Sequence, residues 1–117
     1  MSLTVHLGAV VSVVLVATGQ VLFKRVALAL AGGSPLLGRD VVLLGGTALA
    51  IYGGATLLWI HLLRSAPLGR LYPYMALSFV MVTLAGATLF DERIGVAHWA
   101  GLALIVGGLV VIASAEL

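Results

Sequence analysis

Four long stretches without a charged residue decide what this chain can fold into. They cover residues 1–23, 41–63, 71–90 and 94–115, and are 23, 23, 20 and 22 residues long. An α-helix rises about 1.5 Å per residue, so each stretch as a helix reaches about 30 Å, the thickness of a bilayer's hydrocarbon core. The sequence therefore predicts one domain (1–117) of four membrane-spanning helices, at about 3–31, 41–63, 71–90 and 94–115.

The composition argues against most soluble classes of protein. Of the 117 residues, 62% are hydrophobic and 9% are charged, whereas a soluble domain carries about 25% charged residues. The net charge of +2 reflects topology in such a chain, and we expect no nucleic-acid partner. There is no cysteine, which excludes a disulfide or a thiolate site. The three histidines are not spaced to share a metal ion, so we expect no metal and no other cofactor.

Glycine and proline mark the first connection. Residues 32–38 read GGSPLLG and end the first helix, which we expect to continue past Lys24 and Arg25 to Ala31. Asp40 precedes the second apolar run and is placed to cap that helix.

The two later connections are short. Residues 64–70 join the second and third helices, which are therefore antiparallel neighbours. Asp91 and Glu92 indicate a tight polar turn, and the simplest interpretation places them at the start of the fourth helix, near the positive end of its dipole.

The basic residues favour one orientation. Four crossings place both termini and residues 64–70 on one side, and residues 24–40 and 91–93 on the other. The second side carries four of the six Lys and Arg residues, namely Lys24, Arg25, Arg39 and Arg93. By the positive-inside rule the second side leans cytoplasmic.

Glycine is abundant, with 15 residues. In lipid the hydrophobic effect contributes little to helix association, so association depends on small residues that let helices pack closely. Gly101 and Gly108 share a face of the last helix, and the pairs 45–46 and 53–54 share a face of the second. Two interpretations stay open, packing inside one bundle and a subunit interface on the last helix. A transporter this small needs a partner, which favours the second.

Polar residues inside the spans are few and uncharged. Ser12, Val16, Gln20 and Lys24 recur every four residues, along one slowly drifting face. The Gln20 amide serves either as a hydrogen bond between helices or as the lining of a headgroup site. Lys24 either snorkels to the interface or, with Arg25, holds a phosphate. No carboxylate lies in mid-membrane, where proton relays and cation sites are normally built on Asp, Glu or His.

Several segments resemble the small multidrug resistance family of the drug/metabolite transporter superfamily. They are residues 19–24 (GQVLFK), 66–73 (APLGRLYP), 77–85 (LSFVMVTLA) and 101–109 (GLALIVGGL), together with Glu92 and the pair His98-Trp99. The pattern is most similar to the two small flippase subunits that move undecaprenyl-phosphate-aminoarabinose across the bacterial inner membrane. The resemblance implies an all-α membrane protein, a four-transmembrane-helix bundle of small multidrug resistance type. It also implies a dimer, either of two copies or with a paralogous subunit.

One departure separates this chain from the drug exporters of that family. Those proteins carry a glutamate in the middle of the first helix, and Val16 occupies the corresponding position. Met75 replaces their helix 3 tryptophan, whereas Tyr72 matches their helix 3 tyrosine. Without the carboxylate, a cation has no counter-charge to offset its desolvation. The residues therefore argue against proton-coupled export of drug cations.

The favoured interpretation is a flippase subunit, not an enzyme, in the bacterial inner membrane. Its substrate is a polyprenyl-phosphate-linked sugar such as aminoarabinose, for modification of lipopolysaccharide or envelope glycan, and membrane lipid surrounds it. The residues expected to bind this substrate are Gln20, Lys24, Tyr72, Ser78, Arg64 and Arg70, the last two as cations at the rim. The residues expected to pack the protomers are Gly101 and Gly108. Two alternatives stay open, an exporter of small organic cations and a noncatalytic accessory subunit of a membrane glycosyltransferase.

Overall fold

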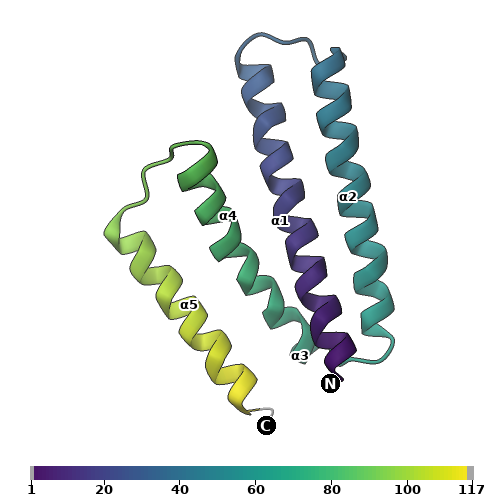
Figure 1. Ribbon diagram of the computed structural model, residues 1–117, viewed down its shortest axis with the longest axis vertical. Helices are drawn as coiled ribbons and strands as arrows, with labels where there is room; N and C mark the ends of the chain where they lie inside the picture. Colours follow the sequence, from purple (N-terminus) through teal and green to yellow (C-terminus); the bar gives the residue numbers. More distant parts are fainter. Residues whose placement is uncertain (1, 116–117) are drawn as a thin grey trace.

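The computed structural model describes residues 2–115, where helices are joined by short connections. α1 (Leu3–Ala31) and α2 (Arg39–Leu63) form an antiparallel hairpin. α3 (Leu68–Leu71), the 3-10 helix η1 (Tyr72–Met75) and α4 (Ala76–Leu89) together make the third rod, and α5 (Val96–Ala115) makes the fourth (Figure 1). All four rods are long and apolar enough to cross a membrane. The expected class, an all-α protein with four membrane-spanning helices, is confirmed.

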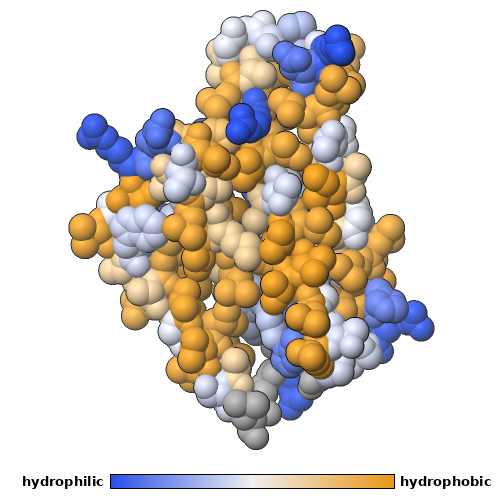
Figure 2. All heavy atoms as spheres, in the orientation of Figure 1, coloured by the Kyte–Doolittle hydropathy of each residue, from blue (hydrophilic) through white to orange (hydrophobic). Residues whose placement is uncertain are grey.

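The rods lie side by side in a thin layer. α1 lies between α2 and α4, and α5 packs on α4 at one edge (Figure 1). The principal axes measure 51 × 37 × 16 Å, so the thinnest dimension is little more than the diameter of one helix, about 10–12 Å. Apolar side chains cover the bodies of the helices, and hydrophilic residues gather toward the ends (Figure 2). Both broad faces are therefore available to lipid or to another protein.

Small residues build the contact between α1 and α2. Ala9, Ser12 and Val13 of α1, with Ala48 and Ala55 of α2, are at most 2% exposed. The Ser12 hydroxyl donates to the Gly8 carbonyl at 3.0 Å, so its burial leaves no unpaired donor. Close approach through small side chains is the normal way for helices to associate in lipid.

Two glycines of α1 set how closely α2 approaches. A Cβ on Gly8 would lie 2.6 Å from Leu62 Cδ2, and a Cβ on Gly19 would overlap the ring of Tyr52. The glycine face of α2 has no such role, because a Cβ on Gly46 or Gly53 would meet no atom within 4 Å.

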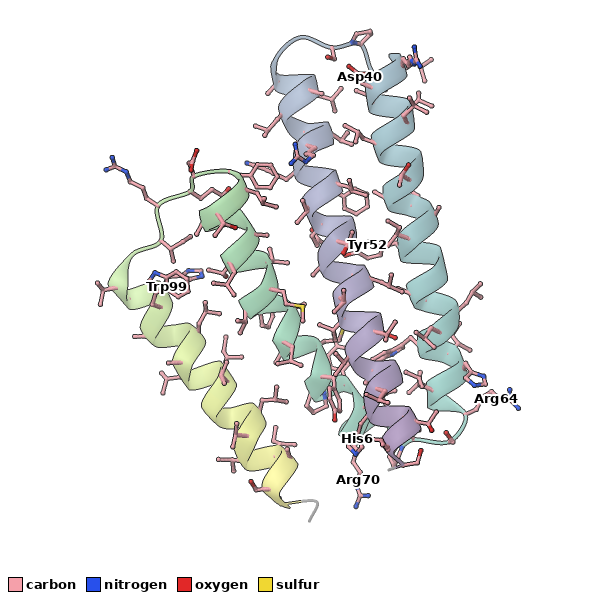
Figure 3. The ribbon with its side chains drawn as sticks, viewed as in Figure 1. His6, Asp40, Tyr52, Arg64, Arg70 and Trp99 are labelled. Atoms are coloured by element: carbon pink, nitrogen blue, oxygen red, sulfur yellow. The ribbon has the colours of Figure 1, made fainter. Side chains whose placement is uncertain are left out.

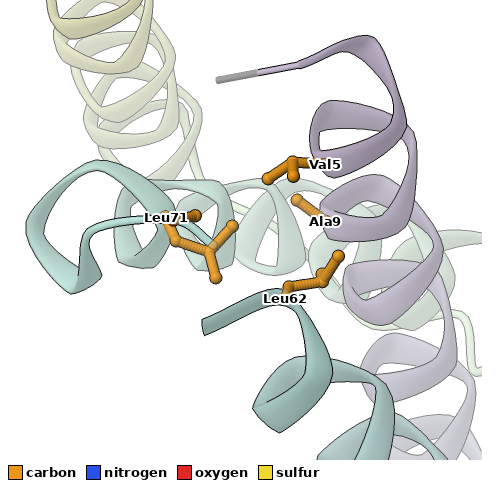
Figure 4. Packing of buried hydrophobic residues seen from close by; sticks show 5 residues of the cluster. Val5, Ala9, Leu62 and Leu71 are labelled. Carbon is orange, nitrogen blue, oxygen red and sulfur yellow. The ribbon is translucent and has the colours of Figure 1, made fainter. Parts of the chain in front are cut away.

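A small apolar cluster fixes the third rod to the hairpin. Val5 and Ala9 of α1 meet Leu62 of α2, Ala66 of the link and Leu71 of α3, and Figure 4 shows four of them converging. Leu71 is completely buried. The cluster lies at the end of the molecule where α1 begins.

Two expected helix starts require correction. Gly38 is the N-cap of α2 and the helix begins at Arg39, so Asp40 lies inside the first turn. There it still faces the positive end of the helix dipole, although it does not cap. The third rod begins at Leu68 and is broken by η1, where Pro73 occupies one of the first two positions. Proline has no N–H to donate to the preceding turn, which favours a tighter turn at that point.

The acidic pair does not start the last helix, contrary to the sequence interpretation. α4 ends at Leu89 and α5 begins at Val96, so Asp91 and Glu92 belong to the connection. Asp91 has φ 51, a left-handed conformation that ends helices and that Asp tolerates better than most residues. The chain then turns back, and the Glu92 N–H donates to the carbonyl of Gly86 at 3.0 Å. Glu92 is thereby directed toward α1 and not toward α5.

Candidate functional site: a groove between α1 and α4

An open groove of about 360 Å³ lies between α1 and α4, near the connection of residues 90–95. Apolar side chains form most of its wall, which also includes the ammonium of Lys24, the carboxylate of Glu92 and the amide of Gln20. The lining residues are Gln20, Val21, Phe23, Lys24, Ala27, Val82, Ala85, Gly86, Phe90 and Glu92.

An ion pair crosses this groove. Lys24 Nζ lies 3.7 Å from Glu92 Oε2, and the two side chains are 44% and 45% exposed. A pair this exposed adds about 0–1 kcal/mol to stability. The fold therefore gains little from it, and its main consequence is to place opposite charges at one site.

Local backbone features hold Glu92 in place. Gly86 is buried, and a Cβ on it would collide with Glu92 Oε1. The missing side chain is what lets the carboxylate lie over the end of α4. Close by, the Arg25 guanidinium lies 5.6 Å from the centre of the Phe90 ring, a cation–π distance that keeps a second positive charge near the groove.

The position of the groove along α1 places it at the edge of the bilayer. From Leu3, a helix has risen about 30 Å after twenty residues, so Lys24 lies where the hydrocarbon core ends and the headgroups begin. Val82 and Ala85 lie one to two turns before the end of α4. The groove thus extends from a charged mouth at headgroup depth to apolar walls inside the membrane.

Gln20 faces two neighbours. Its Nε2 donates to the Tyr52 hydroxyl of α2 at 2.5 Å, while the same side chain lines the groove. The Tyr52 ring also stacks on Phe23, with ring centres 5.3 Å apart. Figure 3 shows Tyr52 partway along the α1–α2 hairpin. The structure thus contains the interhelical bond expected as one alternative, and the role of Gln20 in a headgroup site stays a prediction.

The remaining residues predicted to bind substrate lie elsewhere. Tyr72 and Ser78 line a second open groove, of about 390 Å³, on η1 and α4. The Ser78 hydroxyl donates to the Met75 carbonyl at 2.6 Å, whereas Tyr72 is 62% exposed. Arg64 and Arg70 lie at the end of the molecule near the N-terminus, far from Asp40 (Figure 3). The predicted substrate residues therefore fall into three places. The groove between α1 and α4 holds Gln20 and Lys24, the second groove holds Tyr72 and Ser78, and neither groove is lined by Arg64 or Arg70.

α5 offers its surface to a neighbour. Leu102 is the one buried residue between Val96 and Ala115. A Cβ on Gly101 or Gly108 would meet no atom within 4 Å, so neither glycine serves packing within the chain. Their role between protomers stays a prediction.

His6 and His98 take part in contacts between helices. His6 Nδ1 pairs with the Tyr74 hydroxyl, and His98 Nε2 lies 3.2 Å from Thr83 Oγ1. Among residues 2–115, no three potential metal ligands gather at one place.

Sequence reasoning missed two residues of the groove region. Glu92 was noted, but its interpretation as a helix start hid the pairing with Lys24, which joins segments far apart in the chain. Tyr52 was missed although a signal existed. A phenolic hydroxyl in the middle of an uncharged span needs a partner inside the membrane, and Gln20 is the partner it finds.

Four apolar spans and a groove with a charged mouth and apolar walls define a small multi-pass membrane protein with an amphipathic groove on its surface. No family model matches the chain, and no solved structure matches it. Curated proteins do. The chain is 45% identical over 76 residues to a protein of Escherichia coli O81 (strain ED1a) named probable 4-amino-4-deoxy-L-arabinose-phosphoundecaprenol flippase subunit ArnE, covering 65% of this chain and 68% of that protein.

Relatives from Escherichia coli O127:H6 (strain E2348/69) and Shigella flexneri serotype 5b (strain 8401) carry the same name. Each is 43% identical over 76 residues, with the same shares of both chains covered. The chain belongs to the ArnE family of flippase subunits. It is a multi-pass protein of the bacterial inner membrane, and its relatives are named for transport and not for catalysis.

Proposed function

We propose that this chain is one subunit of a flippase that moves polyprenyl-phosphate-linked aminoarabinose across the bacterial inner membrane. Relatives at 43–45% identity are named for this substrate. The observation that carries the proposal is the groove between α1 and α4, where charges at the mouth give way to apolar walls. That gradient suits a lipid whose headgroup leaves water while its tail remains among lipid chains.

Lys24 is the proposed phosphate ligand. Its ammonium stands at headgroup depth in the groove, and Arg25 adds positive charge beside it. Cations at one depth of a membrane protein attract anionic headgroups. Once the phosphate enters the lower dielectric of the groove, the same attraction strengthens and offsets part of the desolvation cost.

Transport proceeds without direct proton coupling in this proposal. Val16 is half-buried in α1 and occupies the place where a proton-coupled relative carries its acid. No bond in the substrate is made or broken, so the chain acts as a transporter and not as an enzyme.

A second subunit completes the pathway. One thin layer of helices leaves its broad faces open, which does not shield a headgroup from lipid. The partner is a second copy or a paralogue, packed against the Gly101 and Gly108 face of α5, where a Cβ would meet open space. Tyr72, Ser78, Arg64 and Arg70 then lie toward the far end of the route, where the headgroup leaves.

The test is translocation in proteoliposomes. The purified chain, alone and with a paralogous subunit, is reconstituted with the amino-sugar lipid, and a membrane-impermeant amine reagent counts the headgroups that reach the outer leaflet. We expect acceleration over protein-free vesicles. Lys24→Ala lowers the rate about tenfold or more, because a hydrogen bond to a charged group contributes about 1.5–3 kcal/mol.

Arg39→Ala is the matched control, because it removes a basic residue from the same side, outside the groove. An acceleration that is absent with every subunit combination would contradict the proposal. Proton-coupled uptake of a quaternary amine by the same vesicles would support the exporter instead.

A further inference from the structure

The Lys24–Glu92 pair matches the charges of an amino sugar linked to phosphate. Such a headgroup is a zwitterion, with an ammonium at one end of the sugar ring and a phosphate at the other. We infer that Glu92 is the specificity-determining residue of the groove. Its carboxylate binds the sugar ammonium while Lys24 binds the phosphate, and the Lys24–Glu92 pair is exchanged for two pairs with the lipid. This inference rests on the proposed function.

The observed pair is easy to open. Its separation of 3.7 Å exceeds the 2.7–2.9 Å of a tight charge-assisted hydrogen bond. Both side chains are about half exposed, so water already solvates each charge. Separating the two groups to admit a headgroup therefore costs little free energy.

A specific backbone arrangement directs the Glu92 carboxylate into the groove. A left-handed residue at Asp91, a return bond from the Glu92 N–H to Gly86, and the missing Cβ of Gly86 together direct the carboxylate into the groove. Asp91, the neighbouring acid, does not line it. The ion pair itself contributes little to stability, so the role that this inference assigns to the carboxylate is binding.

The pair discriminates between lipids because an incorrect lipid leaves the Glu92 carboxylate without a counter-charge. A phosphate lipid with a neutral sugar draws Lys24 away from Glu92, and the carboxylate then stands at the edge of the bilayer without a counter-charge. An uncompensated charge in a low-dielectric site is costly. The amino sugar supplies the missing cation, so the groove favours it partly by penalising its neutral analogue.

A purely structural role for Glu92 makes a different prediction. If the carboxylate only positions Lys24, its loss changes the affinity for both lipids by the same factor. The ratio of the two affinities therefore distinguishes recognition of the ammonium from positioning of Lys24.

The experiment measures that ratio in the full-length chain embedded in lipid nanodiscs. Two radiolabelled farnesyl-phosphate probes differ in one group, a 4-amino or a 4-hydroxy substituent on the arabinose. The wild-type chain is expected to prefer the amino probe about tenfold or more, as sites built for a polar group do. Glu92→Gln lowers the affinity for the amino probe until the preference disappears, while the neutral probe binds as well as before or better.

Asp91→Asn is the matched control, because it removes the same charge one residue away and asparagine accepts a positive φ. It retains the preference. Lys24→Gln weakens both probes and leaves the ratio near the wild-type value. Binding of the neutral probe by Glu92→Gln reports in the same assay that this variant is folded.

Each remaining outcome decides against the inference. A Glu92→Gln chain that keeps the preference, or that loses both probes equally, removes Glu92 from recognition and leaves the proposed function intact. If the wild-type chain binds neither probe above a phosphatidylglycerol background, the proposed function fails, and the inference fails with it.

Discussion

Two glycines of this chain make room for the polar side chains of the groove. Gly19 leaves space for the ring of Tyr52, which holds the Gln20 amide, and Gly86 leaves space for the carboxylate of Glu92. Neither Gly19 nor Gly86 adopts a positive φ, so each matters for the space that its missing side chain leaves. At both positions the smallest possible change, one methyl group, tests whether the geometry matters.

Gly86→Ala is expected to displace Glu92 from the groove and to remove the preference for the amino probe. The added Cβ collides with Glu92 Oε1, whereas alanine in a helix interior favours folding by about 1 kcal/mol. Binding ratio and thermal unfolding in detergent are measured together. Gly46→Ala is the control, because a Cβ there meets open space. A Gly86→Ala chain with the wild-type ratio would show that the carboxylate position is unimportant.

Tyr52→Phe and Gln20→Leu are expected to be energetically coupled. Each removes one partner of the hydrogen bond between α1 and α2, and bonds of this kind in membranes contribute about 0.6–2 kcal/mol. In a double-mutant cycle, the second substitution should therefore cost less once the first is present. Unfolding of all four chains in detergent gives the coupling. Strictly additive losses would contradict the bond, and Thr18→Val, whose hydroxyl bonds within α1, serves as the control.

Among the helices, η1 and the start of α2 show which features the sequence did not predict. The spans follow from uncharged runs long enough to cross a bilayer, and that information is local. The break at η1 has a local cause in Pro73, yet a proline near a helix start is usually compatible with one continuous helix. The true start of α2 depended on whether Gly38 or Asp40 adopts the extended cap conformation, which composition does not determine.

Substitutions of the glycines on α5 and on α2 are expected to affect assembly differently. Gly101→Leu and Gly108→Leu are expected to reduce the dimer by at least about tenfold, because leucine prevents the close approach that small residues allow. Gly46→Leu and Gly53→Leu, seven residues apart on α2 and equally open, should leave it unchanged. Cross-linking through an introduced cysteine is clean, because the chain has none of its own. Loss of the dimer from the α2 variants alone would place the interface on α2.

At the scale of the whole molecule, the sequence did not predict the contacts between segments that are far apart in the chain. Gln20 and Lys24 were expected in a site from their spacing on one helix. Glu92 joined them through the turn after α4, a reversal that depends on the conformation of Asp91 and on the open space at Gly86. Tyr72 and Ser78 were expected in the same cleft, but they lie on η1 and the first turn of α4, at the other end of the third rod. The packing of the rods determines which residues of different rods lie close together. The spacing of residues within one helix does not reveal these contacts.

The orientation of the whole chain gives the last prediction. The start of α1 and the end of α5 lie at one end of the layer, together with the link after α2 (Figure 1). The opposite end carries four of the six Lys and Arg residues, and the positive-inside rule places that end, with the charged mouth of the groove, in the cytoplasm. Ser34 lies in the loop at this end and Ser65 in the link at the other.

Single cysteines at these two serines report the orientation, because the chain has no other cysteine. In intact spheroplasts, a membrane-impermeant maleimide is expected to label Ser65→Cys and to leave Ser34→Cys unlabelled until the membrane is opened. Arg93→Cys should behave as Ser34→Cys does, since its connection lies at the same end, and it controls for local shielding of the loop. The reverse pattern would place the mouth of the groove at the periplasmic face. Equal labelling of Ser34→Cys and Ser65→Cys in intact spheroplasts would mean that the chain inserts in both orientations, and that an excess of two basic residues is too small to orient it.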